Sequence, residues 1–167
     1  MAIHRLNHAV LYVRDAERSA TFFTELLGFR RLDGESEQGA GIPGAAFLRA
    51  EASTNDHDLA LFSIGDAAAD SPAGRSSVGL YHLAWEVPTL TDLAEAKERL
   101  AELGALVGEN NHGVSRSLYC QDPDGIEFEV MWEVPADLLA PDEPSNVPLD
   151  LDADVARFGA ARRGRGA

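Results

Sequence analysis

Two histidines stand in the same local setting in two distant parts of the chain. Asn7-His8 is followed by Val13, and Tyr81-His82 is followed by Val87, so each histidine lies in a short apolar segment of strand character. Each segment then leads into a stretch with helical spacing. The sequence therefore predicts one supersecondary unit used twice. Two imidazoles that meet where the two repeats come together would form a metal site.

Two carboxylates near the end of the second repeat extend this pattern. Glu127 and Glu129 are two residues apart in a predicted strand, so they point to the same face. Glu129 lies among Phe128, Val130 and other apolar residues, where a buried carboxylate needs a partner. Two histidines and one glutamate can form a facial triad that leaves open positions for a substrate and O2 on Fe(II). Taken singly, each histidine is more often a core residue than a ligand, so it is the repeat that favours a site.

The elements that must position these residues follow the order β-α-β-β-β in each half, which predicts an α+β fold. Gly28 and Gly104 are expected to end the two helices, and Asp122-Pro123-Asp124-Gly125 is a strong hairpin signal. The first half is predicted to hold strands at 6–13, 29–32, 45–50 and 57–64, a helix at 16–27 after Asp15, and a loop at 35–44. The second half is predicted to hold strands at 80–87, 106–108, 116–121 and 126–133, and a helix from Thr89 or Thr91 to about residue 103.

The domain organisation predicted from this pattern has four parts. Residues 1–66 form the first module, 67–77 a linker rich in small and polar residues, and 78–134 the second module. Residues 135–167 differ in composition, with several prolines among many acids and an arginine-rich end. We expect this tail to be an extended arm or a partly disordered segment.

Composition limits the classes of function. The net charge of -14 argues against a nucleic-acid partner and suits a small-molecule substrate. No apolar run approaches a membrane span, and the first residues lack a signal-peptide pattern, so we expect a cytoplasmic protein with no membrane partner. The single Cys120 excludes an intramolecular disulfide framework and is expected to be structural.

The chain resembles the vicinal oxygen chelate superfamily, which includes glyoxalase I, the fosfomycin and bleomycin resistance proteins and the extradiol dioxygenases. The resemblance lies in Leu6-Asn7-His8 through Asp15, Phe22 through Phe29, Tyr81 through Val87, and the Asp-Pro-Asp-Gly turn with Glu129. It covers about residues 3–134, and its closest pattern is that of single-domain extradiol-like members. It implies paired βαβββ modules that form an open, mixed-sheet barrel around a divalent metal, with ligands at His8, His82 and Glu129.

The resemblance also separates the activities within the superfamily. Glyoxalase I has a fourth ligand, a glutamate in the last strand of the first module, and Ala60 stands there in this chain. His57 resembles the acid/base histidine of the extradiol enzymes, and Tyr119 matches a tyrosine that hydrogen-bonds the bound catecholate. Asn110 stands where those enzymes have a further histidine, and His112, two residues on, is the candidate for that role. From the residues alone, His57 is equally a polar turn residue, and His112 most simply an exposed one.

These observations lead to three hypotheses. The leading one is an Fe(II)-dependent extradiol-type dioxygenase for a catechol-like vicinal diol and O2, with Mn(II) as a substitute. The second is a glyoxalase- or epimerase-type lyase or isomerase that uses Zn(II), Ni(II) or Co(II). The third is a metal-free drug-binding protein, for which the acidic charge would favour a cationic ligand. Members of the superfamily often form homodimers, and modules pair within one chain or between two.

Overall fold

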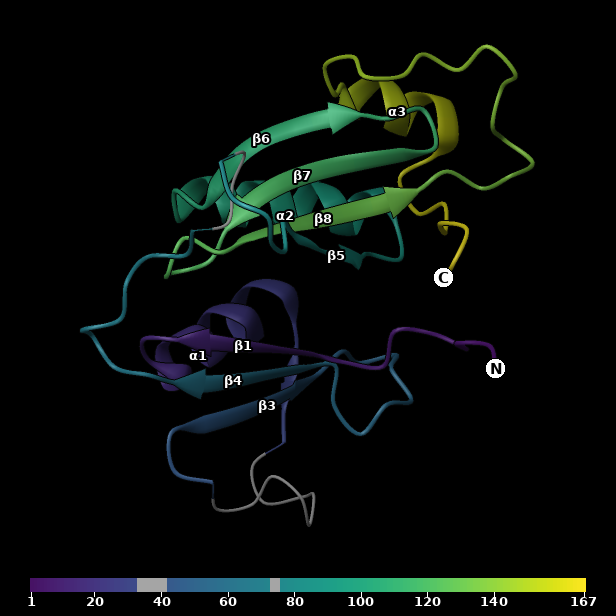
Figure 1. Ribbon diagram of the computed structural model, residues 1–167. Coiled ribbons are helices and arrows are strands. Elements are labelled where there is room, and N and C mark those ends of the chain that lie inside the picture. The colour runs from purple at the N-terminus through teal and green to yellow at the C-terminus, as the bar shows by residue number, and fades with distance from the viewer. Residues whose placement is uncertain (33–41, 73–75) are drawn as a thin grey trace. The chain divides into compact units, whose positions relative to one another are not determined.

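The computed structural model describes residues 1–32, 42–72 and 76–167, which form two compact units, Met1–Ser71 and Pro72–Ala167 (Figure 1). The predicted loop at 35–44 lies mostly outside the described residues, as does part of the predicted linker. Each unit has its own four-stranded mixed sheet. The expected βαβββ order is present in both, and the two sheets are separate rather than one closed barrel.

The first unit places one helix against its sheet. Its elements are β1 (Ala9–Val13), α1 (Ala16–Leu27), β2 (Arg30–Arg31), β3 (Ala45–Arg49) and β4 (Leu59–Ser63). The strand order is β1-β4-β3-β2, in which β1 and β4 run parallel and the other pairs run antiparallel. The helix buries Ala20, Phe23 and Leu26, which recur at the spacing of one helical face.

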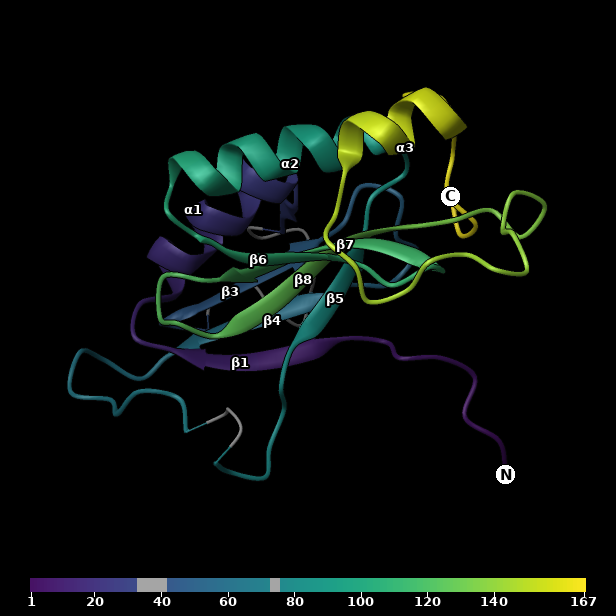
Figure 2. The ribbon, with the colours of Figure 1, turned by 90° about the horizontal axis from the view of Figure 1, so that it is seen from above.

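The second unit repeats this arrangement and adds a helix. Its elements are β5 (Leu83–Glu86), α2 (Leu90–Glu102), β6 (Leu106–Asn111), β7 (Ser115–Gln121), β8 (Glu127–Glu133) and α3 (Leu151–Phe158). The order β5-β8-β7-β6 matches that of the first sheet, again with the outer pair β5 and β8 parallel. Figure 2 shows α2 and α3 on the same face of this sheet. Tyr119, Glu127 and Glu129 of β7 and β8 alternate with the residues beneath the helices and lie on the opposite face.

The turn between β7 and β8 forms as the sequence predicts. Asp122 Oδ1 accepts hydrogen bonds from the backbone N–H groups of Asp124 and Ile126, both at 2.8 Å. Gly125 follows in the left-handed region with φ 78°, a conformation that glycine adopts without steric cost. This turn sets the register of β8 and therefore the face on which Glu129 lies.

The predicted first strands of the two modules extend too far at their amino ends. Hydrogen-bonded pairing begins at Ala9 with Leu59 and at Leu83 with Phe128. His8 and His82 are therefore the residues immediately before their strands, at the same point of each unit. His57 likewise lies before β4 rather than inside it.

The prediction of an extended or disordered tail is wrong. Residues 135–167 belong to the second unit, and Asp150 caps α3 by accepting a hydrogen bond from Ala153 N–H. The ring of Phe158 packs 5.5 Å from that of Trp132, which is fully buried. Arg116, also fully buried, donates to Asp154 and Glu143 at 2.7 and 2.9 Å. The proline-rich composition gives no sign of α3, because this short helix is stabilised by contacts with Trp132 and Arg116, which are distant in the sequence.

Candidate functional site

The register of the second sheet puts the predicted polar residues on one face. Tyr119 in β7 pairs directly with Glu129 in β8, and Glu129 pairs on its other side with Ala84 in β5. The neighbouring residues Leu118, Cys120 and Val130 point to the opposite, helix-covered face and are buried. Because side chains alternate along a strand, Tyr119 and Glu129 project from the face without helices.

His82 and Glu129 form a close pair. His82 Nε2 lies 3.0 Å from Glu129 Oε2, and the two side chains are 24 % and 10 % exposed. The other ring nitrogen of His82, Nδ1, is buried and has no hydrogen-bond partner within the described residues. A nitrogen and a carboxylate oxygen each about 2.1 Å from one metal, at a right angle, lie about 3 Å apart. The pair thus has the spacing of two neighbouring metal ligands.

Tyr119 connects this pair to His112. Its ring centroid lies 5.7 Å from that of His82, and its hydroxyl lies 2.6 Å from His112 Nε2. Burial, and then the negative charge of Glu129, raise the pKa of Tyr119 above its ordinary value. The phenol is therefore held in its protonated form near neutral pH, and its O–H is available as a donor.

The first unit brings His8 and His57 together. Their ring centroids are 4.4 Å apart, and the ring of Phe47 lies edge-on to His57 at 5.2 Å. His8 Nδ1 lies 2.8 Å from Asn7 Oδ1, whose amide in turn contacts Asn55. Burial lowers the pKa of His57, and the neighbouring His8 lowers it further, against the opposing effect of Asp56 and Asp58.

The internal repeat gives Glu129 a counterpart in the first unit. Two residues after His82, Ala84 pairs with Glu129, and two residues after His8, Val10 pairs with Ala60. Ala60 therefore occupies the position in β4 that Glu129 occupies in β8. An alanine methyl cannot ligate a metal, so this position in the first unit carries no carboxylate.

The predicted ligands are divided between the units, with His8 in the first and His82 and Glu129 in the second. Among the described residues, no group of three or more His, Cys, Asp or Glu side chains lies together in a way that could hold a metal ion. What the structure brings together is the pair His82–Glu129. Cys120 is buried beneath this face, and burial raises the pKa of its thiol to about 12, which fits a structural role.

Asn146 is a site residue that sequence reasoning missed. Its side-chain oxygen lies 3.1 Å from His112 Nδ1, the nitrogen opposite the one that faces Tyr119. It lies in the segment taken from the sequence to be an extended tail. An asparagine in a proline-rich stretch gives no local signal for such a contact, since the contact depends on pairing between Asn111 and Val147.

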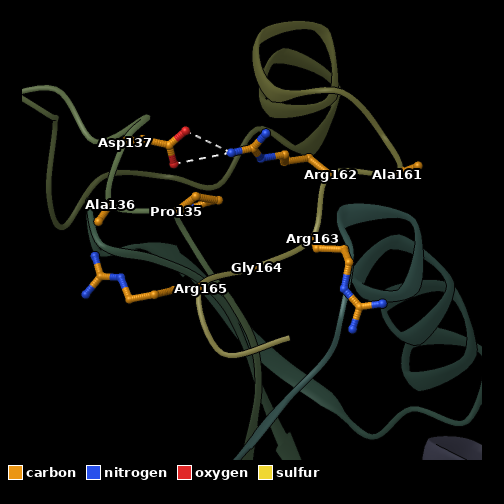
Figure 3. Close-up of a pocket in the computed structure, with 8 residues that line it drawn as sticks. All are labelled: Pro135, Ala136, Asp137, Ala161, Arg162, Arg163, Gly164 and Arg165. Carbon is orange, nitrogen blue, oxygen red and sulfur yellow. Dashed lines mark hydrogen bonds and ion pairs between the residues drawn. The ribbon is translucent and has the colours of Figure 1, made fainter.

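A separate cavity of about 480 Å³ lies near the carboxyl end of the chain (Figure 3). The residues that line it are Pro135, Ala136, Asp137, Ala161, Arg162, Arg163, Gly164 and Arg165. Arg162 and Asp137 form an ion pair at 3.0 Å beside it. None of the candidate residues lines this cavity, so it is a different feature from the site around Glu129.

No helix in the described part of the chain is long and apolar enough to cross a membrane.

Comparisons with known proteins place the candidate residues in context. The family model described as Glyoxalase/Bleomycin resistance protein/Dioxygenase superfamily matches residues 5–130. A catechol-2,3-dioxygenase of Bacillus subtilis (strain 168) is 30 % identical over 148 residues, covering 89 % of this chain and 48 % of that protein. A manganese-dependent 2,3-dihydroxybiphenyl 1,2-dioxygenase of Geobacillus genomosp. 3 is 28 % identical over 137 residues, covering 79 % and 38 %.

A solved structure is also similar. The glyoxylase/bleomycin resistance protein/dioxygenase domain from Frankia sp. EAN1pec superposes with a TM-score of 0.61 at 26 % identity, covering 81 % of this chain and 96 % of that one. The match to the two dioxygenases is partial in length, because this chain spans about half or less of each. The match to the Frankia domain spans nearly all of that chain.

Proposed function

Because this chain belongs to the glyoxalase/bleomycin resistance protein/dioxygenase superfamily, we propose that it is a metal-dependent extradiol-type dioxygenase. Its substrates are a catechol-like vicinal diol and O2. The observation that carries this proposal is the pair His82–Glu129, whose facing atoms are 3.0 Å apart. The similarity to two ring-cleaving dioxygenases supports it.

The donor set fits a divalent metal. His82 and Glu129 supply a nitrogen and an oxygen at the spacing of adjacent ligands. His8 is the third donor that the sequence predicts. Two histidines and one carboxylate form the set typical of non-haem Fe(II) sites with open positions, and Mn(II) accepts similar ligands. A divalent metal held there would supply Lewis-acid chemistry that lowers the pKa of a bound diol.

The remaining residues orient the substrate and move protons. The Tyr119 ring lies beside that of His82 in the strand position opposite Glu129, and its hydroxyl oxygen accepts a hydrogen bond from a substrate hydroxyl. His57, whose ring lies next to that of His8, serves as the general acid and base, a role that suits an imidazole near neutral pH. His112 accepts the hydrogen bond of Tyr119 and keeps the phenol in one orientation.

The absence of a carboxylate at Ala60 favours ring cleavage over glyoxalase chemistry. Ala60 is buried and stands in the register position of Glu129. A lyase of the glyoxalase type needs a ligand or base from the first unit at this point. Formation of lactoylglutathione from the methylglyoxal–glutathione hemithioacetal would reverse this choice.

Metal binding tests the ligand assignment. Protein reconstituted anaerobically with Fe(II) or Mn(II) and then desalted should retain the metal, and Glu129→Gln should lose most of it. Glu127→Gln is the matched control, because Glu127 lies two residues earlier in the same strand and on the same face. Equal metal content in the two variants would overturn the assignment of Glu129.

Turnover tests the reaction. The Fe(II)- or Mn(II)-loaded protein, mixed with a panel of catechols and O2, should form yellow ring-cleavage products. His57→Phe should reduce turnover by roughly 100-fold or more, the usual contribution of a general acid or base, with metal content unchanged. A loaded protein inactive on the whole panel would refute the dioxygenase proposal, and a purified protein that binds no divalent metal would point to the binding-protein alternative.

A further inference from the structure

The segment that follows β8 returns to the hairpin between β6 and β7 and is held there by its backbone. Asn111 and Val147 exchange two hydrogen bonds, at 3.0 and 3.2 Å, and Ser145 Oγ donates to the carbonyl of His112 at 2.9 Å. Gly113 approaches Pro144 so closely that a Cβ there would lie 3.3 Å from the proline carbonyl oxygen. Asn146 is thus fixed between contacts on both sides.

The backbone of Asn146 has an unusual conformation. Its φ of 58° is in the left-handed region, and no other non-glycine residue of the described part has a positive φ. Asparagine tolerates this region better than most residues, but glycine adopts it at lower cost. The turn alone therefore does not require an asparagine. What asparagine adds at this position is its side-chain amide.

That amide is a hydrogen-bond partner for one nitrogen of His112. Asn146 Oδ1 lies 3.1 Å from His112 Nδ1, and since an amide oxygen can only accept, it bonds Nδ1 when that nitrogen carries the hydrogen. Asn110 Nδ2 lies 3.2 Å from the same Nδ1, 3.5 Å from Nε2 and 3.5 Å from Asn146 Oδ1, and it would donate to Nδ1 only in the other tautomer. The Tyr119 hydroxyl lies 2.6 Å from Nε2, at the short end of the range for an O–H donor, which favours a bare Nε2 and the hydrogen on Nδ1.

We propose that Asn146 is a positioning residue that holds His112 in its Nδ1–H tautomer, so that Nε2 accepts the proton of Tyr119. In this tautomer the hydroxyl hydrogen of Tyr119 points at His112, while the Tyr119 ring lies 5.7 Å from that of His82. This part of the proposal stands on the geometry alone.

Its catalytic consequence rests on the proposed function. A substrate hydroxyl gives its proton to the Tyr119 oxygen while Tyr119 gives its own proton to His112 Nε2. The substrate is left as an oxyanion, the phenol is regenerated, and His112 becomes an imidazolium that keeps its Nδ1–H···O bond to Asn146. No oxidant enters this step. The segment beyond the matched family region 5–130 thereby supplies a residue to the active site.

The tautomer can be measured on the metal-free protein. In ¹⁵N–¹H correlation spectra of histidine-labelled protein, with His112 assigned by its loss in His112→Gln, the wild type should show Nδ1 protonated and Nε2 bare. Asn146→Gly, which relaxes the backbone but removes the amide, should shift His112 toward the other tautomer. Asn146→Asp retains an acceptor and should preserve the wild-type pattern. Asp142→Ala, at an exposed position in the same segment, is the control and should also preserve it.

An unchanged His112 tautomer in Asn146→Gly would overturn the proposal, as would Nε2 protonation in the wild type. If Asn146→Gly does not fold, the wild-type tautomer gives the decision by itself. Activity is a separate readout. Asn146→Gly should lower kcat for catechol cleavage by roughly 10- to 100-fold, as loss of a supporting partner of an active-site histidine does, with Asn146→Asp closer to wild type. A wild type without ring cleavage would refute the proposed function and leave the tautomer result standing.

Discussion

Arg116 is a buried charged residue that connects several segments of the second unit. Its side chain is fully buried and contacts Asp154, Glu143 and the carbonyl of Gly113. Arg116 lies on the same apolar face of β7 as Leu118 and Cys120. A buried cation at such a position is destabilising unless carboxylates or carbonyl groups bond to it. The sequence shows that Arg116 is a charged residue at an apolar position of a strand. It does not show which acidic residues pair with it.

The carboxylate of Glu143 gives a pH-dependent test of this cluster. A hydrogen bond from Arg157, and then one from Arg116, hold the pKa of Glu143 below its ordinary value of 4.5. The folded state therefore binds this proton less tightly than the unfolded state, and the stabilisation is complete above about pH 4.5 and is lost as pH falls through the lower, folded pKa.

Glu143→Gln should lower the free energy of unfolding by about 2 kcal/mol at pH 7, the size of a hydrogen bond to a charged group. In urea titrations at several pH values, the difference from wild type should shrink below about pH 4.5. Glu102→Gln, at an exposed position in the last turn of α2, is the control and should change stability little at any pH. A constant difference across the acid range would contradict the role assigned to Glu143.

At the scale of elements, the helices of the two modules were predicted better than the strands. Helix ends are set locally, by Asp15 and Thr89 at the amino ends and by Gly28 at one carboxyl end, and these signals are visible in the sequence. Strand ends are set by partners. β1 begins at Ala9 because pairing with β4 begins there. β6 continues to Asn111 because β7 pairs with it beyond a bulge between Leu106 and Gly108.

The same difference explains what was missed. Leu151, Val155 and Phe158 have the spacing of one helical face, but acidic, proline-rich surroundings are typical of extended or disordered segments. In the site, the repeat and the residue types pointed to His82 and Glu129, and the family resemblance pointed to Tyr119, which the structure places in register with Glu129. The contact of Asn146 with His112 depends on chain return over a long sequence separation, which no local pattern encodes.

The cap of α1 is testable in isolation. Asp15 accepts hydrogen bonds from the backbone N–H groups of Glu17 and Arg18, at 2.9 and 3.3 Å. Asp15→Ala should destabilise the protein by about 1 kcal/mol, while Asp15→Asn should retain most of the stability because its side-chain oxygen can still accept. Thermal unfolding followed by circular dichroism measures both. Equal losses would show that the charge, and not the cap geometry, matters at this position.

At the scale of the whole molecule, the second unit is larger than the family region that matches it. The match ends at residue 130, whereas the unit extends to Ala167 and uses the added segment to cover its apolar face. Trp132 is fully buried, packs against Phe158, and donates from its indole N–H to the carbonyl of Arg162 at 3.2 Å. The segment is thus part of the core of this unit.

A chain ending at Val134 should therefore have a strongly destabilised second unit, although it contains the entire matched region. Removing the segment exposes Trp132 and leaves Arg116 without its two carboxylates. Loss of partners for a buried charge alone costs about 3–5 kcal/mol, against a typical total stability of about 5–15 kcal/mol. Tryptophan emission should shift to the red, and the urea transition should broaden or move to lower concentration.

The matched control is a chain ending at Gly164. It loses the Arg165–Glu133 ion pair, whose side chains are 41 % and 29 % exposed, and the hydrogen bond from Gly166 N–H to Glu86, but it retains α3. Because an exposed ion pair contributes about 1 kcal/mol or less, this chain should unfold close to the wild type. If the chain ending at Val134 unfolded at the same urea concentration as this control, the packing of α3 on Trp132 and Arg116 would contribute nothing to stability. The second unit would then be complete without the segment that carries Asn146.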